Sequence, residues 1–312
     1  MQPEKIIIRK MGTTITLSIT HTEAKQLLEQ AEAMLSDFEA RFSANDPNSD
    51  LMQISQYAGI KPIKVDDDLF KLIKIGRTVS ISSGGTFNIA IGPLVKLWRI
   101  GFDDAQLPSG EEVKKRLQLI DPMNIILDES EQTVFLQEKG MEIDLGAIAK
   151  GYFADLLKEY FQANGVESGI IDLGGNVLTI GTSSNQADGY FRVGIQHPFQ
   201  PRGNMFAVIA VQDQSVVTSG IYERTLRIND KEYHHIFDSK TGHPTENDVA
   251  SVTIVSDQSI DGEIWTTLAF GKDAKAGINW LNQITGIEGV IISKAGDIYV
   301  SKQLKNRITL AK

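Results

Sequence analysis

The stretch Glu142-Ile-Asp-Leu-Gly-Ala-Ile-Ala-Lys-Gly-Tyr-Phe-Ala-Asp155 predicts a strand-to-helix junction that carries an acid and a base. Asp144 and Lys150 lie six residues apart in it, and Gly146 and Gly151 leave the backbone without side chains. Backbone amides can then approach a ligand, and the positive end of the following helix points toward it. A phosphate-bearing ligand fits this pattern. An ordinary helix start with a solvated lysine fits it equally well, so other segments must decide.

The composition limits the partners of the chain before any motif is considered. The 312 residues include 31 Lys and Arg and 40 Asp and Glu, which gives a net charge of −9. The sequence contains no basic block of the kind that neutralises nucleic-acid phosphates, so we expect no nucleic-acid partner. The chain has no cysteine, which excludes disulfides, thiolate metal sites and a cysteine nucleophile.

The N-terminal sequence gives an expectation about the compartment. The apolar run Ile6-Ile-Ile8 is much too short for a signal peptide or a membrane span, and no lipoprotein cysteine is present. We therefore expect a cytoplasmic protein without a membrane span, or an extracytoplasmic one if a leader was removed.

Strand-like and helix-like segments alternate irregularly along the chain. Apolar residues from Leu27 to Phe42 recur at helical spacing, and Ser109-Gly-Glu-Glu112 has the form of a capping box. The irregular order argues against a doubly wound parallel sheet and predicts an α+β protein. Further helices are expected at residues 67–81, 147–165 and 260–285, and strands at residues 5–20, 124–127, 133–137 and through much of 169–255. No linker divides the sequence, so we expect a single domain over residues 1–312.

Two adjacent histidines stand in the segment Tyr233-His-His-Ile-Phe-Asp-Ser-Lys-Thr-Gly-His-Pro244. On a strand, His234 and His235 face opposite sides, so only one of them can address a given pocket. A zinc site that uses both is therefore not expected. One histidine as a proton carrier and the other in a structural role fits better, because imidazole exchanges protons near neutral pH.

Oxygen ligands are grouped in Asp261-Gly-Glu-Ile-Trp-Thr-Thr-Leu-Ala-Phe270. On a helix, Glu263 and Thr267 are four residues apart and share a face, with Thr266 alongside. A carboxylate with hydroxyls suits a hard cation such as Mg²⁺ and suits zinc poorly. The same three side chains also fit a solvated first turn of a helix.

Together these segments resemble the FAD:protein FMN transferases, the ApbE-type flavin transferases, which attach FMN covalently to a threonine or serine of a target protein. The resemblance covers nearly the whole chain, and its pieces follow in the family's order. They are Met11-Gly-Thr13, Phe42-Ser43, Ser49-Asp-Leu51, Gly85-Thr-Phe-Asn88, Gly92-Pro-Leu-Val-Lys-Leu-Trp98, Ile143-Asp-Leu-Gly-Ala-Ile-Ala-Lys-Gly-Tyr152, Asp172-Leu-Gly-Gly175, Thr218-Ser-Gly-Ile-Tyr222, His234-His-Ile-Phe-Asp238 and Thr241-Gly242.

The resemblance implies an ApbE-like fold with antiparallel-rich sheets and flanking helices, and it implies the site residues. The implied FAD-binding residues are Met11, Asn45, Thr86, Phe87, Asn88, Asp144, Lys150 and Ile236. The implied magnesium ligands are the backbone oxygen of Ala147 and the side chains of Glu263, Thr266 and Thr267. His235 and Lys150 are the implied catalytic residues, His235 as the base for the acceptor hydroxyl and Lys150 beside the pyrophosphate.

The implied reaction is transfer of FMN from FAD to a Thr or Ser hydroxyl of an acceptor flavoprotein. The hydroxyl attacks the FMN-side phosphorus and AMP leaves, while Mg²⁺ and Lys150 offset the charge of AMP. FAD is therefore a substrate in this interpretation, and Mg²⁺ is the cofactor.

Three positions depart from the family pattern. The family usually has Asp where Glu263 and Asn88 stand, and it has a tyrosine near Asn45 that stacks on the flavin, so Tyr57 or Trp98 would have to replace that ring. Two other functions stay open. One is hydrolysis of FAD to FMN and AMP, and the other is non-catalytic FAD binding, which the Glu263 and Asn88 departures favour slightly. The sequence does not name the acceptor, the oligomeric state or the metal preference.

Overall fold

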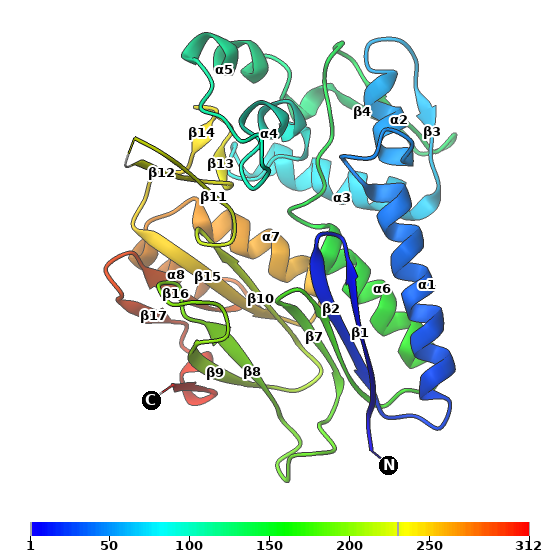
Figure 1. Cartoon of the computed structure of the whole chain (residues 1–312), viewed down its shortest axis with the longest axis vertical. Helices are drawn as coiled ribbons and strands as arrows, with labels where there is room; N and C mark the ends of the chain where they lie inside the picture. Colours follow the sequence, from blue (N-terminus) through cyan, green and yellow to red (C-terminus); the bar gives the residue numbers. More distant parts are fainter. Residues whose placement is uncertain (1, 230, 312) are drawn as a thin grey trace. The chain divides into compact units, whose positions relative to one another are not determined.

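The computed structural model describes residues 2–229 and 231–311, and Figure 1 labels its helices and strands. Contacts between residues group the chain into two compact units. The first unit contains residues 1–39, 150–220 and 247–312, and the second contains residues 40–149 and 221–246. Each unit is thus assembled from segments far apart in the sequence. The expectation of one domain over residues 1–312 stays a prediction.

The first unit contains an eight-stranded sheet in which all neighbouring strands pair antiparallel. In spatial order its strands are β1 (Glu4–Lys10), β2 (Thr13–Ile19), β6 (Ser168–Leu173), β7 (Asn176–Gly181), β10 (Ser215–Gly220), β15 (Val249–Ser256), β16 (Glu288–Ser293) and β17 (Ile298–Val300). Every residue of β15 is buried, because this central strand is covered on both faces.

Helices cover one face of this sheet (Figure 1). They are α7 (Ser259–Phe270), which packs on β10 and β15, and α8 (Ala274–Leu281), which packs on β16. The rings of Trp265 and Trp280 join these helices, with centroids 5.1 Å apart. In the same unit, α1 (Ala24–Phe42) contacts α6 (Ala149–Ala163) through Phe38 and Phe153, whose rings stack at 4.5 Å.

A three-stranded sheet packs against the other face. It consists of β18 (Ile308–Leu310), β9 (Met205–Val211) and β8 (Phe191–Gln196), and the short helix η3 (Leu304–Asn306) precedes β18. Apolar side chains of both sheets form one core, in which Phe191 and Ile209 pack with Val216 and Val255. Burial of such side chains is the main stabilisation of a two-layer arrangement.

The second unit is built from short elements. They are α2 (Asp50–Gln56), β3 (Ile63–Lys64), α3 (Asp67–Ser82), η1 (Ile89–Ile91), α4 (Gly92–Trp98), α5 (Gly110–Leu117), η2 (Pro122–Asn124), β4 (Ile125–Asp128), β5 (Thr133–Leu136), β11 (Thr225–Ile228), β12 (Lys231–His234), β13 (Phe237–Asp238) and β14 (His243–Pro244). One of its core clusters surrounds Trp98, which packs with Phe237 and Tyr233.

The expected α+β class with antiparallel-rich sheets is confirmed. All strand pairings between described residues are antiparallel, and the expected segment 5–20 forms the hairpin of β1 and β2. Ser109 accepts from the N–H of Glu112, whose carboxylate accepts in return, which completes the predicted capping box. The helices α2 and α4 were not predicted, because each has only seven residues and shows no long apolar periodicity.

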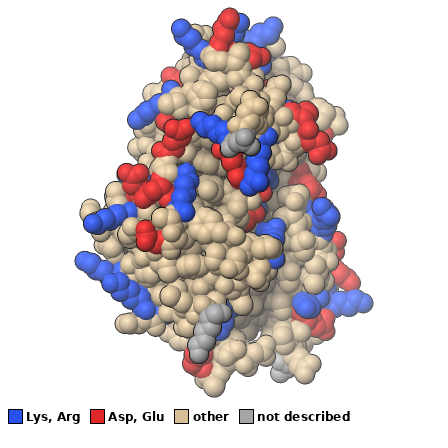
Figure 2. Space-filling view, turned by 60° about the vertical axis from the view of Figure 1, so that its left-hand side comes forward, with Lys and Arg blue, Asp and Glu red and all other residues tan. Residues whose placement is uncertain are grey.

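The surface carries charges of both signs. On the face drawn in Figure 2, the lysine and arginine side chains lie among aspartate and glutamate side chains. Among the described helices, none combines the length and the apolar character that crossing a bilayer requires.

Candidate active site

Helices α6 and α7 of the first unit come into close contact at Gly151. A Cβ at this position would lie 2.6 Å from the carbonyl oxygen of Ser259 and 2.8 Å from Cγ of Glu263. The sequence interpretation assigned Gly151 to the approach of a ligand to the backbone, and that assignment is wrong. The absence of a side chain instead allows α7 to pack against α6, which carries Lys150 one residue earlier.

The carboxylate of Glu263 is buried on α7, with 6% of the residue exposed. Its Oε1 accepts a hydrogen bond of 2.8 Å from Nδ2 of Asn176. Burial raises the pKa of Glu263, and the positive charge of Lys150 and the bond from Asn176 oppose that rise. Lys150 and Glu263 are therefore close enough to interact, as a site that handles a phosphate and a cation requires.

A chain of buried polar groups fixes the Asn176 amide. Ser259 Oγ donates to Oδ1 of Asn176 at 2.7 Å, and Ser215 Oγ donates to Ser259 Oγ at 3.0 Å. These bonds orient the amide so that its NH₂ group faces Glu263. Sequence reasoning missed Asn176, although it directly follows the quoted Asp172-Leu-Gly-Gly175 motif.

The two threonines predicted as metal ligands direct their hydroxyl protons to the same acceptor. Thr266 Oγ1 donates to the carbonyl oxygen of Glu263 at 2.9 Å, and Thr267 Oγ1 does so at 3.1 Å. Thr266 is fully buried and also accepts from Ser219, whereas Thr267 is only partly buried. Thr267 is thus the better placed of the two to offer an oxygen lone pair to a cation.

The donor set around Glu263 fits a hard cation. It offers one carboxylate and hydroxyl oxygens, and it contains no nitrogen or sulfur ligand. The carboxylate has about four lone pairs, and one of them accepts the hydrogen bond from Asn176. Within residues 2–229 and 231–311, no group of three or more His, Asp or Glu side chains could hold a metal ion by itself. A cation here therefore depends on hydroxyl, backbone or substrate oxygens in addition to Glu263, as is usual for Mg²⁺.

A second carboxylate of the first unit lies near Lys150. Burial raises the pKa of Asp172, while the N–H groups of Gly175 and Gly174 and the charges of Arg202 and Lys150 lower it. Gly174 and Gly175 have φ values of 73° and 99°, which the turn requires. Lys150 is thus close enough to interact with two carboxylates, Asp172 and Glu263.

Met11 occupies a turn at the end of the same sheet. Met11 and Gly12 have φ values of 50° and 69° and form the two-residue turn between β1 and β2. The N–H of Met11 donates to Oε1 of Glu39 at 2.5 Å. Thr13 lies beside Gly174, where a Cβ would clash with its side chain, so the Met11 turn lies next to the Asp172 turn. A left-handed methionine is strained, and such strain is often found at binding sites.

In the second unit, Ser83 organises the loop that carries Thr86, Phe87 and Asn88. Its Oγ donates to the carbonyl oxygen of Phe87 at 2.8 Å and accepts from the N–H groups of Phe87 and Gly85, each at 3.2 Å. The Phe87 side chain is buried, whereas Thr86 is partly exposed. The loop backbone is therefore held in one conformation, and Thr86 is the more accessible of the two residues.

The side chain of Asn88 has a structural role in this loop. Its Oδ1 accepts from the N–H of Ala90 at 2.8 Å and caps η1, while its Nδ2 donates to the carbonyl oxygen of Ile120 at 2.7 Å. The aspartate that the family usually has here cannot donate the second bond. The departure from the family pattern is thus explained by a local hydrogen bond.

Asp144 lies directly beside this loop, because its N–H donates to the carbonyl oxygen of Ile89 at 2.8 Å. Its Oδ1 accepts from the N–H of Gly146 at 2.8 Å, and a Cβ on Gly146 would lie 2.9 Å from that oxygen. Burial raises the pKa of Asp144, while the Gly146 bond and the charges of Arg224 and Lys96 lower it. Gly146 therefore allows a close approach, but the group that approaches it is the Asp144 carboxylate of the chain itself and not a ligand.

The two adjacent histidines differ in burial, although strand β12 ends at His234 and His235 lies just beyond it. His234 is buried, its Nε2 lies 3.0 Å from the carbonyl oxygen of Thr245, and its Nδ1 accepts from the N–H of Ile236 at 3.3 Å. These bonds fix a neutral imidazole with the proton on Nε2. His235 is more exposed, and its Nδ1 faces the carbonyl oxygen of Arg224 at 3.4 Å. A proton on Nδ1 leaves Nε2 of His235 as the basic nitrogen.

The histidine segment also borders the Ser83 loop. The N–H of Ser239 donates to the carbonyl oxygen of Gly85 at 3.2 Å. Residues 238–242 form a turn, because the N–H of Gly242 donates to the carbonyl oxygen of Asp238 at 2.8 Å. Residues of three separate segments therefore meet around this loop.

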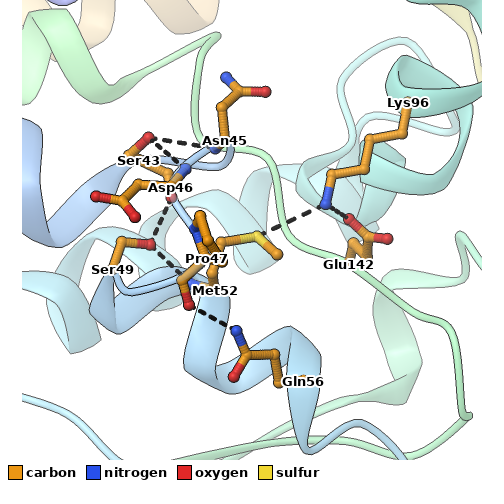
Figure 3. A network of polar contacts seen from close by, with 9 residues as sticks. All are labelled: Ser43, Asn45, Asp46, Pro47, Ser49, Met52, Gln56, Lys96 and Glu142. Carbon is orange, nitrogen blue, oxygen red and sulfur yellow. Dashed lines mark hydrogen bonds and ion pairs between the residues drawn. The ribbon is translucent and has the colours of Figure 1, made fainter.

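Asn45 belongs to the loop that precedes α2, and hydrogen bonds within the loop stabilise it (Figure 3). Ser43 Oγ accepts from the N–H groups of Asn45 and Asp46 at 3.2 and 3.1 Å, and Ser49 Oγ donates to the carbonyl oxygen of Ser43 at 2.6 Å. The Asn45 side chain is exposed and points away from these bonds. Figure 3 also shows Met52 of α2 in contact with Lys96, which pairs with Glu142.

Trp98 cannot replace the missing tyrosine as a flavin platform. The indole is completely buried, its Nε1 donates to the carbonyl oxygen of Gly242 at 3.0 Å, and core rings surround it. Tyr57 is 38% exposed at the end of α2, with the Lys61 ammonium 4.4 Å from its ring centroid. Of the two aromatic residues considered, only Tyr57 has a ring accessible to a ligand.

The structure thus brings together two sets of predicted residues, each within its own unit. In the first unit, Lys150, Glu263, Thr266 and Thr267 meet where α6 packs on α7, and Met11 lies beside the Asp172 turn. In the second unit, Thr86, Phe87, Asn88 and Asp144 gather around the Ser83 loop, and the segment that carries His235 and Ile236 contacts this loop through Ser239. Ala147 and Asn45 belong to the second unit and are exposed.

Comparison with known proteins places this arrangement in a family. The family model described as "ApbE family" matches residues 11–291. The chain is 39% identical to an FAD:protein FMN transferase of Klebsiella pneumoniae (96% of this chain, 92% of the relative) and 33% identical to one of Treponema pallidum (92% and 82%). A crystal structure of the ApbE protein of Thermotoga maritima superposes with a TM-score of 0.89 at 25% identity, covering 98% of this chain and 99% of the other. The chain therefore belongs to the ApbE family.

Proposed function

We propose that this protein transfers FMN from FAD to a Thr or Ser hydroxyl of an acceptor protein and releases AMP. The observation that carries the proposal is the similarity over nearly the whole chain to proteins named FAD:protein FMN transferase. The site supports it, because a lysine, a buried carboxylate and hydroxyl oxygens are grouped on two contacting helices.

The assignment of FAD-binding residues follows the family resemblance. Lys150 supplies a positive charge for the pyrophosphate, and the strained Met11 turn supplies backbone groups. The rigid loop with Thr86 and Phe87, together with Asp144, holds the remainder of the dinucleotide. Because these groups address more than the FMN half, FAD should bind more tightly than FMN.

Glu263 and Thr267, with the carbonyl oxygen of Ala147 implied by the family resemblance, would hold Mg²⁺. When bound, this cation would offset the negative charge that develops on the departing AMP phosphate. Its all-oxygen donor set supports Mg²⁺ over zinc. The longer side chain of Glu263, compared with the family's aspartate, is fixed by the amide of Asn176.

His235 is the proposed base. As the acceptor oxygen forms its bond to the FMN-side phosphorus, Nε2 of His235 takes the hydroxyl proton, and the bond from that phosphorus to the AMP oxygen breaks. The carbonyl oxygen of Arg224 supports this role, because it holds the other proton of the ring on Nδ1. Lys150 balances the charge of the released AMP.

The test combines the purified protein, FAD, Mg²⁺ and a flavoprotein domain that carries a target threonine. We expect the mass of one FMN to be added to the acceptor, and none to a Thr→Ala acceptor or in the presence of a chelator. Free FMN and AMP without modified acceptor would instead indicate an FAD pyrophosphatase. FAD binding without turnover would indicate a binding protein.

The compartment is a separate proposal. We propose that the protein acts in the cytoplasm, and fractionation of native cells with an antibody to the chain tests this. Recovery in an extracytoplasmic fraction would contradict it.

A further inference from the structure

Helix α7 begins with a cap that comes from another helix. The N–H of Ser259 donates to Oδ1 of Asp155 at 2.7 Å, and the N–H of Ile260 donates to Oδ2 of the same residue at 2.9 Å. Gln258, which precedes the helix, makes no side-chain cap. One carboxylate of α6 thus satisfies two of the four N–H groups that a helix start leaves without partners.

Asp155 and Gly151 are four residues apart on α6 and therefore share one face. Asp155 binds the first two residues of α7, and Gly151 packs against Ser259 and Glu263. Gly151 also contacts Ile260, so both residues of α6 meet the first turn of α7, and the Gly151 contact extends to Glu263 one turn further along. Two contacts a turn apart fix how far α7 can slide along α6, and they fix the Glu263 carboxylate relative to Lys150.

We propose that Asp155 is a positioning residue, whose cap holds α7 at the height at which Glu263 and Thr267 bind the cation. This inference rests on the proposed function, because it concerns the cation of that reaction. Asp155 itself touches neither substrate nor metal in this proposal. Its effect passes through the first turn of α7, which precedes Glu263 by one helical turn.

The surroundings of Asp155 determine the pH range in which the cap is fully formed. The pKa of Asp155 is raised to about 6, mainly by burial and also by the negative charge of Asp261 on α7. The N–H groups of Ser259 and Ile260 and the charge of Lys158 on α6 oppose this rise. Lys158 also pairs with Asp213 at 2.9 Å, which weakens its influence. An ionised carboxylate accepts strongly at both oxygens, whereas a protonated one has a single good acceptor. The cap should therefore weaken as the pH falls below about 6.

The first test compares Asp155→Asn with Asp248→Asn. Asp248 accepts from the N–H of Ala274 at 2.8 Å and so caps α8, which makes it a matched control on the neighbouring helix. We expect Asp155→Asn to raise the Mg²⁺ concentration for half-maximal FMN transfer on the order of tenfold, as for loss of a group that orients a ligand. The KM for FAD should change less than about twofold. The increase in Tm that Mg²⁺ causes in the presence of FAD should shrink in parallel.

The outcomes separate a positioning role from a structural one. A lower Tm with an unchanged Mg²⁺ requirement would overturn the proposal, as would an equal effect of Asp248→Asn. If the wild-type chain modifies no acceptor, the proposed function fails, while the Mg²⁺-induced shift in Tm still tests the positioning role.

A second test uses the wild-type chain and so avoids variants that fold poorly. Hydrogen exchange of single amides is compared at pH 5 and pH 7.5 after correction for intrinsic rates. Protection of the Ser259 and Ile260 amides should fall at the lower pH by roughly fivefold, the equivalent of about one weakened hydrogen bond. Protection of the Ala274 amide should hold. Equal behaviour of the two helix starts would contradict the cap.

Discussion

Replacing Gly151 with alanine should destabilise the protein, although alanine is the better helix former. The new Cβ would lie 2.6 Å from the carbonyl oxygen of Ser259 and 2.8 Å from Cα of Ile260. These are backbone atoms, which cannot rotate away, so the cost lies toward the upper part of the roughly 1–3 kcal/mol typical of overpacking. Alanine returns about 1 kcal/mol of helix propensity. The free energy of unfolding should therefore fall by about 1–2 kcal/mol.

Gly110→Ala is the matched control for this measurement. Gly110 begins α5, and a Cβ there meets no atom within 4 Å. This variant should be neutral or gain up to about 1 kcal/mol. Both proteins are unfolded in urea at equilibrium and followed by circular dichroism, with the slope against urea checked for constancy. Equal stability changes for Gly151→Ala and Gly110→Ala would refute the close packing of α6 and α7.

Three further predictions follow from the polar contacts. His234→Ala should lower the free energy of unfolding by about 1–3 kcal/mol in urea, because the partly buried carbonyl group of Thr245 loses this hydrogen bond. His235→Ala should instead slow FMN transfer on the order of a hundredfold at nearly wild-type stability. The reverse assignment would contradict the tautomers described above. Glu263→Ala should abolish Mg²⁺-dependent turnover, and wild-type turnover of this variant at limiting Mg²⁺ would contradict the cation site. Glu263→Asp should keep activity if the family's shorter side chain also reaches the cation. Asn88→Asp should cost about 1–3 kcal/mol in the same urea assay, because an oxygen replaces the donor that faces Ile120; unchanged stability would show that this bond contributes little.

Local patterns predicted the parts of the site that lie within one element. The spacing of Glu263 and Thr267 placed both on one helix, whose geometry repeats every few residues, so the sequence alone contains it. The capping box at Ser109 was predictable for the same reason. The expected difference between His234 and His235 is present, but strand β12 ends at His234, so alternation along a strand is not its cause.

Contacts between distant segments could not be predicted in this way. Asp155 reaches a helix start that is 104 residues away, and Asn176 reaches Glu263 across 87 residues. Trp98 has the ring that a flavin platform needs, but its burial depends on packing against residues from separate segments, such as Phe237 and His243. Gly151 was assigned to ligand approach because a glycine marks a close contact without naming the partner.

The positions of the three tryptophans allow each unit to be followed by its own fluorescence. Trp98 lies in the core of the second unit, whereas Trp265 and Trp280 form a pair on α7 and α8 of the first unit. In a chain that keeps only Trp98, emission during denaturation follows the second unit alone, and in a chain that lacks only Trp98 it follows the first. Coincident transitions would identify a single cooperative domain, and separate transitions would identify two.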